Sequence, residues 1–328
     1  MNESGAARIS TRRVLVTEFP NHFLPSGRAR RAQDLVNYLQ PSAVVSVGDK
    51  PGPPLSRMLR LCVFWHRASA YPATTLILAA LSSPHLLLLP LLTPRSLGTW
   101  AVDLCDSLAD SEEDTWFTRI RNLISRVLIN QLHRRSRLRC VYYISPIDCQ
   151  LDRAWLPKGL EIHVVEPTLA QELINLEIEN RALTRVILPF DLRQESNRVM
   201  LHFLIEKFQG ESVSFDLYGP VPPENKLETN FRFRGYAGTL TEIYGGGGIV
   251  AAFDDRARGI QNKVLEACLA GLPVVCSRES ALRFKPLPTI HVVENLQGLE
   301  STIRALIGTL GPILDVRLRA APLLENQI

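Results

Sequence analysis

Short runs of apolar, β-branched residues alternate with segments of helical periodicity, in two successive series along this 328-residue chain. The first series begins with an expected strand over residues 13–19, a helix over 28–39 and a strand over 43–47. The second begins with a strand over 184–190 and a helix over 197–208. A strand, helix, strand order favours a parallel sheet covered by helices. The alternation therefore predicts an α/β protein with two Rossmann-like domains that face each other across a cleft.

The predicted domains have similar lengths. Residues 1–168 form the first domain, 169–183 a linker with helical content, and 184–328 the second domain. About 150 residues is a common domain size, so the length fits two domains. Further strands are predicted over residues 100–104, 141–145, 160–165, 213–218, 249–253, 273–276 and 289–293, and further helices over 114–133, 260–270 and 296–310. Apolar runs within residues 57–100 lack a clear period, so they do not distinguish helix from buried strand.

The composition excludes several classes of protein. Hydrophobic residues make up 46% and charged residues 21%, which argues against disorder. The net charge of +4 does not indicate a nucleic acid partner. The six cysteines include no CxxC pair, so neither a zinc site nor a disulfide scaffold is expected, and a cytoplasmic setting follows. The polar residues 1–13 do not resemble a signal peptide, and the apolar residues 76–92 are interrupted and shorter than the about 20 residues that span a bilayer.

The densest functional signal follows the expected strand at residues 249–253. A charged loop over 254–258 is closed by Gly259, and a helix then begins. The start of a helix offers unpaired backbone N–H groups and about half a positive charge, which suits a diphosphate. Glu266 lies beyond the first turn, where its carboxylate could accept two hydrogen bonds from a ribose diol. The segment therefore predicts a nucleotide site.

The same segment resembles the family-4 glycosyltransferases of the GT-B fold, which carry the run G-I-Q-N-K-V-L-E-A-x-x-x-G-x-P-V-V. The matching residues are Gly259, Ile260, Gln261, Asn262, Lys263, Val264, Leu265, Glu266, Ala267, Gly271, Pro273, Val274 and Val275. The sequence looks most similar to bacterial sugar transferases of polysaccharide and exopolysaccharide assembly. The resemblance implies a nucleotide-diphosphate sugar as donor, retention of anomeric configuration, and neither a metal nor a cofactor. A weaker similarity covers the stretch from Gly235 to Tyr244, which resembles a G-Y-x-x-x-L-x-x-Y element.

The sequence departs from the family at two places in the donor site. The family's E-x7-E pair ends at Glu266 here, but Arg258 stands at its first position, so the contacts with the donor sugar would either differ from the family's or come from Asp254 or Asp255. The strand at residues 184–190 lacks the glycine that usually ends it. We expect Arg193, Arg198 or Lys263 to supply the phosphate-binding cation, together with the amides of the loop at Gly27.

The acceptor is expected on the first domain. Asp103 and Asp106 belong to a D-x-x-D-S element and are candidates for acid–base work, although Asp106 could equally cap a turn. His22, in the first loop, is a third catalytic candidate, although a lone histidine in a loop is usually just exposed. The acceptor could be a sugar, a lipid-linked molecule or a small molecule. The basic residues 133–139 favour a solvated helix end over peripheral contact with the anionic inner membrane face.

Three other functions compete with sugar transfer. A degenerate GT-B scaffold could bind carbohydrate or a protein partner without catalysis, which Arg258 and Phe190 motivate. A UDP-sugar epimerase of the same fold is the next alternative. A two-domain dehydrogenase is disfavoured because no GxGxxG follows a strand, and the glycine run at residues 245–248 precedes its strand, as a flexible connection would.

Overall fold

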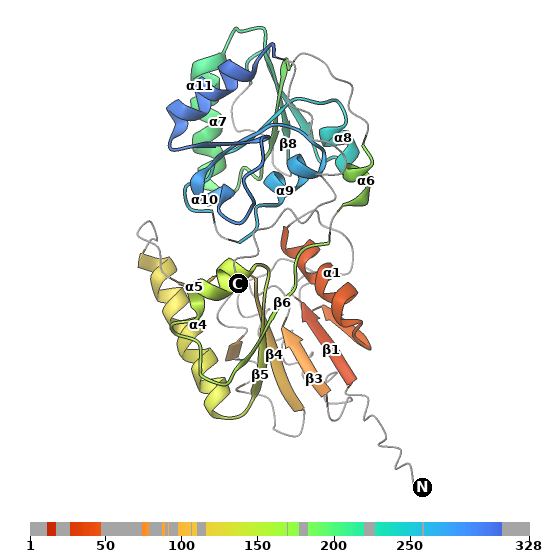
Figure 1. The fold of residues 1–328 in the computed structure, drawn as a ribbon, viewed down its shortest axis with the longest axis vertical. Coiled ribbons are helices and arrows are strands. Elements are labelled where there is room, and N and C mark those ends of the chain that lie inside the picture. Colours follow the sequence, from red (N-terminus) through yellow and green to blue (C-terminus); the bar gives the residue numbers. More distant parts are fainter. Residues whose placement is uncertain are drawn as a thin grey trace. The chain divides into compact units, whose positions relative to one another are not determined.

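The protein is described here from a computed structural model, in which the chain forms two compact units, Met1–Thr168 and Leu169–Ile328 (Figure 1). Each unit has its own sheet and its own core, and each is described by itself. The structure describes residues 12–17, 27–46, 74–78, 87–88, 91, 98–105, 107–109, 116–168, 170–176, 183–219, 227–257 and 259–309.

Unit 1 is a parallel sheet flanked by helices. Its six strands pair in the order β2-β1-β3-β4-β5-β6, and every pair in the sheet is parallel. The elements are β1 (Arg12–Thr17), α1 (Gly27–Leu39), β2 (Ala43–Ser46), β3 (Thr74–Leu78), β4 (Gly98–Cys105), α4 (Trp116–Arg134), β5 (Leu138–Tyr143), α5 (Pro146–Asp152) and β6 (Glu161–Val164).

Alternate residues of the unit 1 strands point to opposite faces of the sheet, and both faces are buried. Leu15 and Ala101 pack on the face covered by α1, together with Leu35. Their neighbours along the strands, Val16 and Val102 among them, pack on the other face in the cluster that contains Ile129 and Leu132 of α4. Figure 1 shows α1 on one side of the sheet and α4 and α5 on the other.

Unit 2 repeats this plan. Its six strands are parallel and pair in the order β12-β11-β10-β7-β8-β9. The elements are α6 (Gln171–Ile174), β7 (Arg185–Pro189), α7 (Glu195–Phe208), β8 (Ser214–Tyr218), β9 (Phe231–Gly235), α8 (Leu240–Tyr244), β10 (Ile249–Ala252), α9 (Asn262–Leu269), β11 (Val274–Ser277), α10 (Arg278–Ala281), β12 (Ile290–Val293) and α11 (Leu296–Leu306).

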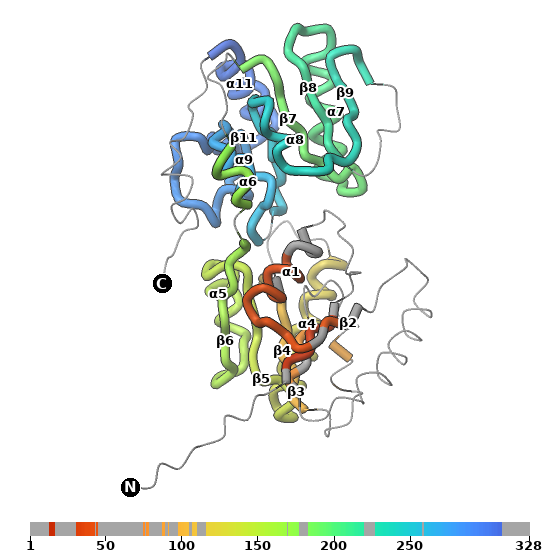
Figure 2. Tube along the Cα trace, turned by 90° about the vertical axis from the view of Figure 1, so that its right-hand side faces the viewer, coloured from red at the N-terminus to blue at the C-terminus, as the bar shows by residue number. Residues whose placement is uncertain are grey.

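The helices of unit 2 form two layers. α7 and α11 lie side by side on one face of the sheet, over a core that includes Val186, Leu188, Met200 and Leu204, while α6, α8 and α9 lie on the other face (Figures 1 and 2). The segment expected to be a linker contains α6, which contacts α8 and α9. Among the described residues, no helix is both long and apolar enough to cross a membrane.

The α/β class and the parallel sheets follow the sequence prediction, with differences in detail. β3 lies inside the apolar stretch that had no clear period, and β9 was not expected. The helix predicted from residue 260 begins at Asn262 instead. Gly259 has a left-handed backbone with φ of 63°, and Gln261 is extended, so neither residue continues into the helix.

Candidate functional site

The candidate site of unit 2 lies where the chain reverses its direction across the sheet. From β7 the chain continues to β8 and β9 on one side, and it returns to β10 on the other side of β7. β7 and β10 are therefore neighbours whose following loops and helices separate, and ligands of parallel α/β sheets bind at the carboxyl ends of strands at such a reversal point. The loop after β10 leads to α9, and the loop after β7 leads to α7.

Close backbone packing fixes the end of β7. A Cβ atom built on Gly219 would lie 1.8 Å from the carbonyl oxygen of Phe190, so only glycine fits there. The Phe190 N–H donates to the carbonyl of Tyr218 at 2.8 Å, which continues the β7–β8 ladder past the strand end. Phe190, at the end of the strand that lacks the family's glycine, is thus held against the glycine that follows β8.

The first turn of α9 presents the dense sequence motif. Gly259 and Ile260 are buried, and Gln261 is the N-terminal cap with no side-chain hydrogen bond to the helix. Its carbonyl accepts from the Val264 and Leu265 amides at 2.9 and 3.0 Å. The amides that precede Val264 lie at the open end of the helix, where the partial positive charge of the helix dipole is concentrated.

Lys263 places a cation between α9 and α7 at this reversal point. Its ammonium donates to Asn197 Oδ1 at 3.2 Å and lies 5.5 Å from the centre of the Phe190 ring, so it bridges α9 to the start of α7. Among the described residues, no carboxylate lies within ion-pair distance of it. Burial lowers the pKa of Lys263, and the negative charge of Asp254 opposes part of that shift. A partly desolvated ammonium of this kind gains from an incoming anion.

Glu266 is buried one turn further along α9 and is held by an aromatic hydroxyl. Its Oε2 accepts a hydrogen bond from the hydroxyl of Tyr244 at 2.7 Å, and Tyr244 is itself fully buried at the end of α8. Burial of a carboxylate is costly unless donors compensate it. The Tyr244 contact therefore fixes the carboxylate at one position.

The two arginines expected near the phosphates are engaged elsewhere. Arg193 makes a forked contact with Asp191, at 2.9 Å from Nε and 2.7 Å from Nη2, and this partner lowers the pKa of Asp191. Arg198 donates to the carbonyls of Leu192 and Arg193. Both side chains support the loop between β7 and α7. Of the three candidate cations, Lys263 alone inserts between α9 and α7.

In unit 1, Asp103 forms a buried ion pair. Both side chains of the Arg31–Asp103 pair are 0% exposed, and the closest contact joins Arg31 Nη2 to Asp103 Oδ1 at 2.7 Å. Arg31 also donates to the carbonyls of Tyr143 and Val165. The pair therefore connects α1 to the carboxyl ends of β4, β5 and β6. This geometry favours a role in holding α1 on the sheet over the acid–base role predicted for Asp103.

A second buried carboxylate holds the loop after β4. Asp152 accepts from the hydroxyls of Ser107 and Tyr143 and from the amides of Leu108 and Ala109, at 2.7 to 3.0 Å. Burial and the negative charge of Asp152 raise the pKa of Tyr143. Ser107 of the predicted acceptor element thus belongs to a structural network.

The other predicted site residues divide into two groups. Gly27 begins α1, so its amide lies at a helix start after β1. His22, Asp106 and Arg258 lie outside the described residues.

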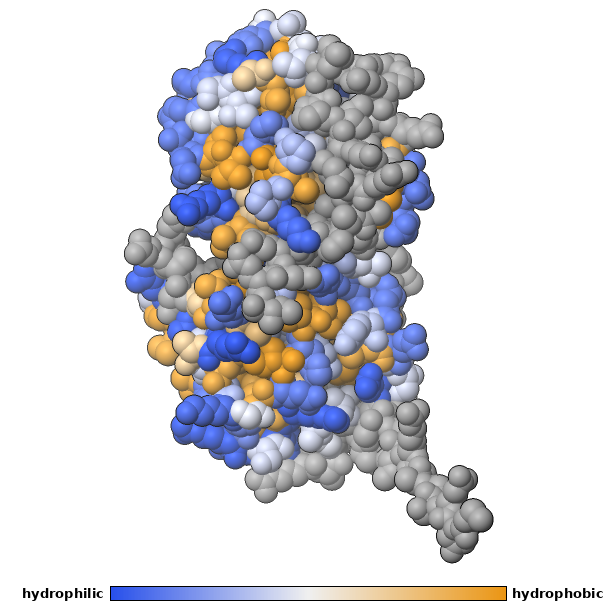
Figure 3. Space-filling view, in the orientation of Figure 1, coloured by the Kyte–Doolittle hydropathy of each residue, from blue (hydrophilic) through white to orange (hydrophobic). Residues whose placement is uncertain are grey.

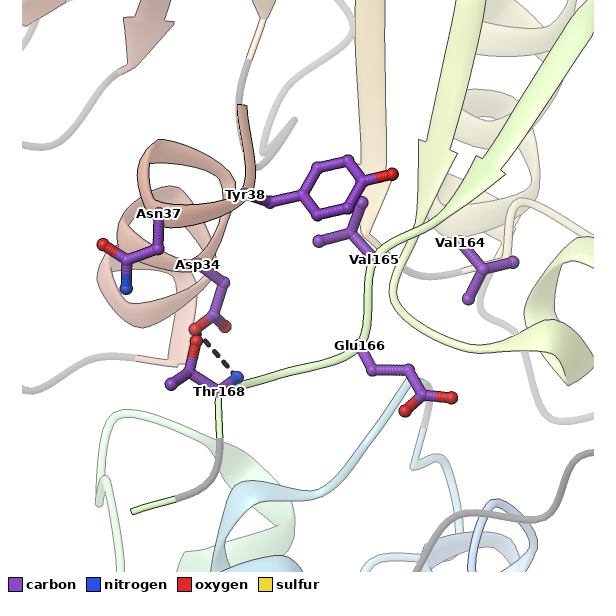
Figure 4. A pocket seen from close by; sticks show the side chains of 7 residues that line it. All are labelled: Asp34, Asn37, Tyr38, Val164, Val165, Glu166 and Thr168. Atoms are coloured by element: carbon purple, nitrogen blue, oxygen red, sulfur yellow. Dashed lines mark hydrogen bonds between the residues drawn. The ribbon is translucent and has the colours of Figure 1, made fainter. Parts of the chain in front are cut away.

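A pocket in unit 1 is lined by residues that the sequence did not predict for a site (Figure 4). It separates the last turns of α1 from the segment that follows β6, and Asp34 crosses it to accept from the Thr168 amide at 3.0 Å. Its lining residues are Asp34, Asn37, Tyr38, Val164, Val165, Glu166 and Thr168.

Three residues that the sequence did not predict for a site hold predicted site residues in place, namely Tyr244, Asn197 and Arg31. Tyr244 lies at the end of the stretch that resembles G-Y-x-x-x-L-x-x-Y, one residue after the position of that pattern's last tyrosine, so the resemblance held a partial signal for it. Asn197 and Arg31 carried no such signal, because each is one polar residue in an ordinary amphipathic helix.

Comparison with known proteins gives matches in structure but not in sequence. No family model matches the chain, and no curated protein matches it. The Anabaena protein HepE in complex with UDP-glucose is similar with a TM-score of 0.63 and 15% identity, covering 89% of each chain. A glycosyltransferase from Rickettsia africae gives 0.61 and 11%, covering 90% of this chain and 88% of its own. The lipopolysaccharide outer core galactosyltransferase WaaB gives 0.54 and 10%, covering 90% and 91%.

The chain has the GT-B fold. The three matches extend over both units, and the two parallel sheets are those of that architecture. At these identities the similarity shows the fold alone.

Proposed function

We propose that the protein is a glycosyltransferase that moves a sugar from a nucleotide-diphosphate donor to an acceptor hydroxyl. The observation that carries the proposal is Lys263, a partly desolvated ammonium beside the first turn of α9 at the reversal point of the unit 2 sheet. A diphosphate supplies the negative charge that this position favours.

The donor's parts match separate features of the site. The diphosphate would accept hydrogen bonds from the amides at the start of α9 and interact with Lys263, which would stabilise the leaving group as charge develops on it. Glu266, fixed by Tyr244, would accept hydrogen bonds from the ribose diol. HepE, one of the structural matches, was obtained with UDP-glucose, which is a donor of this class.

The finer parts of the proposal depend on the sequence motif. The run from Gly259 to Ala267 supports membership of the family-4 glycosyltransferases, with retention of configuration, no metal and a hexose as the transferred sugar. Its similarity to bacterial sugar transferases supports a place in polysaccharide assembly in the cytoplasm. The acceptor would be a sugar, a lipid-linked molecule or a small molecule bound by unit 1.

Calorimetry with UDP, GDP and their sugars tests donor binding directly. We expect one nucleotide series to bind, and Glu266→Ala to weaken it about tenfold to a hundredfold, since hydrogen bonds to a charged group contribute about 1.5–3 kcal/mol. Glu206→Ala, on the exposed face of α7, serves as the matched control and should bind like the parent chain. Failure of every nucleotide to bind would reject the proposal.

One observation favours the alternative of a non-catalytic scaffold. Asp103, the described carboxylate predicted for acid–base work, is buried in an ion pair. An assay of nucleotide release in the presence of acceptor distinguishes the two functions. A scaffold binds the nucleotide sugar without releasing nucleoside diphosphate, whereas a transferase releases it in proportion to the acceptor consumed.

A further inference from the structure

Arg185, the first residue of β7, is the centre of a polar network in unit 2. Its Nε donates to Asp216 Oδ2 at 2.6 Å, and Arg234 Nε donates to the other oxygen of the same carboxylate at 2.8 Å. The Asp216 side chain is 6% exposed and the Arg185 side chain 18%. Hydrogen bonds between charged groups are short and strong, so Asp216 fixes the orientation of the Arg185 guanidinium.

The outer nitrogens of Arg185 are directed at the carboxyl end of α8. Nη2 donates to the Ile243 carbonyl and Nη1 to the Gly247 carbonyl, both at 3.2 Å. The guanidinium therefore contacts the backbone on both sides of Tyr244, the last residue of α8. Arginine is suited to this position, because its N–H donors point in fixed directions from one rigid plane.

Helix α8 depends on such contacts for its position. It has five residues, and a helix of this length is not stable in isolation. The last four carbonyls of a helix have no partner within it. In α8 each of them accepts a hydrogen bond, in chain order from the Gly245 amide, the Tyr218 hydroxyl, the Arg185 guanidinium and the Gly247 amide. The Tyr218 hydroxyl also accepts from Arg185 at 2.7 Å, so Arg185 supports two of the four contacts.

The glycine run at residues 245–248 makes room for Arg185. The sequence predicts a flexible connection here, but in the structure the run packs closely against β7. A Cβ atom on Gly246 would lie 2.7 Å from Arg185 Nη1, and one on Gly248 would lie 2.8 Å from the Arg185 carbonyl oxygen. Gly248 also has a φ of 131°, which residues with a side chain rarely adopt. The two glycines let the chain after α8 approach the guanidinium.

Tyr244 connects this network to the nucleotide site proposed above. Its side chain is fully buried, and its hydroxyl donates to Glu266 Oε2 at 2.7 Å. A hydrogen bond is lost once its heavy atoms lie about 3.5 Å apart, so a shift of under about 1 Å at the end of α8 would break this one. The place of the Glu266 carboxylate thus depends on the contacts that fix α8.

We propose that Arg185 is a positioning residue of the nucleotide site, which holds Tyr244 in place and thereby orients Glu266 toward the ribose. The inference deepens the proposed function and rests on it, since Glu266 has a ribose to contact only if the chain binds a nucleotide. The printed contacts of Arg185 are with Asp216, the Tyr218 hydroxyl and backbone carbonyls, so its effect on the ligand is indirect.

A purely structural role for Arg185 would have a different signature. Its loss would then destabilise unit 2 without changing nucleotide affinity, or weaken binding independently of Tyr244. Arg304 provides the matched control, because it donates to the Glu211 carboxylate and the Lys207 carbonyl from α11, on the opposite face of the sheet. Figure 3 shows mainly hydrophilic atoms along the edge of unit 2 where Figure 1 places α11. Arg304→Met should bind nucleotide like the parent chain.

Calorimetry with UDP and GDP on the full chain tests the coupling. Arg185→Met should weaken binding of the nucleotide about fivefold, as expected for Tyr244→Phe, and Arg185→Lys should not restore it. Combined with Tyr244→Phe, Arg185→Met should add less than about twofold, because residues that act through one contact are not additive. Gly246→Ala should reproduce the loss, since its Cβ displaces only the end of the Arg185 side chain. It also replaces Arg185→Met if that variant does not fold.

A second measurement needs no nucleotide. In the full chain with isotope-labelled tyrosine, the Tyr244→Phe spectrum identifies the Tyr244 ring signal among those of the seven tyrosines. Arg185→Met and Gly246→Ala should shift this signal, because both release the end of α8. Arg304→Met should leave it in place.

Two outcomes would overturn the proposal. One is a double variant in which the losses of affinity caused by Arg185→Met and Tyr244→Phe multiply. The other is a Tyr244 signal that stays in place in both Arg185→Met and Gly246→Ala. If no nucleotide binds the parent chain, the proposed transferase is rejected, whereas the tyrosine signal still decides whether Arg185 places Tyr244.

Discussion

Removing the Asp103 carboxylate should destabilise unit 1 strongly. Asp103→Ala leaves the Arg31 guanidinium buried without its carboxylate, although the Tyr143 and Val165 carbonyls still accept from it. Breaking a buried ion pair by deleting one partner costs about 3–5 kcal/mol. With a urea slope of about 2 kcal/mol per molar, the unfolding midpoint should fall by about 2 M.

Tryptophan fluorescence reports this unfolding selectively. The chain has four tryptophans, and all of them, at positions 65, 100, 116 and 155, belong to unit 1. Trp100 is fully buried in β4, three residues before Asp103. Its emission should shift when unit 1 unfolds and should be insensitive to unit 2.

A surface pair in the same unit provides the control. Arg139 and Glu161 are about half exposed and 3.7 Å apart, so Glu161→Ala should change stability by at most about 1 kcal/mol. The double substitution Arg31→Met with Asp103→Leu should recover most of the lost stability, because apolar replacement of a buried pair is often neutral. Asp103→Ala with an unchanged midpoint, and with transferase activity lost, would refute the structural role and restore the catalytic one.

Three further predictions concern unit 2. Burial lowers the pKa of Lys263 below its ordinary 10.5, so above that lowered pKa the free side chain is mostly neutral. A bound diphosphate favours the ammonium and raises the pKa again, so binding should draw a proton onto Lys263 at pH values between the pKa of the free protein and that of the complex. Calorimetry in buffers of different ionisation enthalpy should detect this uptake, and Lys263→Met should abolish it. Tyr244→Phe removes the hydroxyl that holds Glu266 and should weaken nucleotide binding about fivefold, the equivalent of about 1 kcal/mol, with kinetics of nucleotide release as the second readout. Gly219→Ala should lower the free energy of unfolding by at least about 1–3 kcal/mol, because the new Cβ would meet the Phe190 carbonyl. In the control Gly210→Ala, the new Cβ meets no atom within 4 Å, so this variant should lose only the free energy that corresponds to the strain of its positive φ. Urea unfolding followed by circular dichroism would show equal stabilities of the two variants if the contact with Phe190 were unimportant.

The sequence predicted the fold well where periodicity was clear. The strand, helix, strand series gave the two parallel sheets, because β-branched runs buried on both faces have few alternative structures. β3 escaped prediction since it lies in an apolar stretch without a period. β9 escaped because its residues Phe231–Gly235 alternate with arginines in a short edge strand.

The candidate site was predictable only in part. The residues of the α9 motif are contiguous, so a sequence pattern identifies them together. The partners of those residues come from distant positions: Tyr244 for Glu266, Asn197 for Lys263 and Arg31 for Asp103. The sequence predicts a chemical role for Asp103 but not its ion pair, because Arg31 lies 72 residues earlier in the chain and carries no local mark of the pairing.

The strand order of unit 2 also constrains how the chain reaches its folded state during synthesis. β7 pairs with β8 soon after both emerge, but its partner on the other side, β10, follows roughly sixty residues after β7, and such distant pairings form slowly. Until then, one edge of β7 is unpaired, and an exposed apolar edge invites association with other chains. Because the Lys263 helix follows β10, this edge of β7 is paired before the proposed nucleotide site is assembled. A chain able to bind nucleotide as proposed would therefore have covered this edge of β7, and ligand present during refolding should raise the yield of native protein.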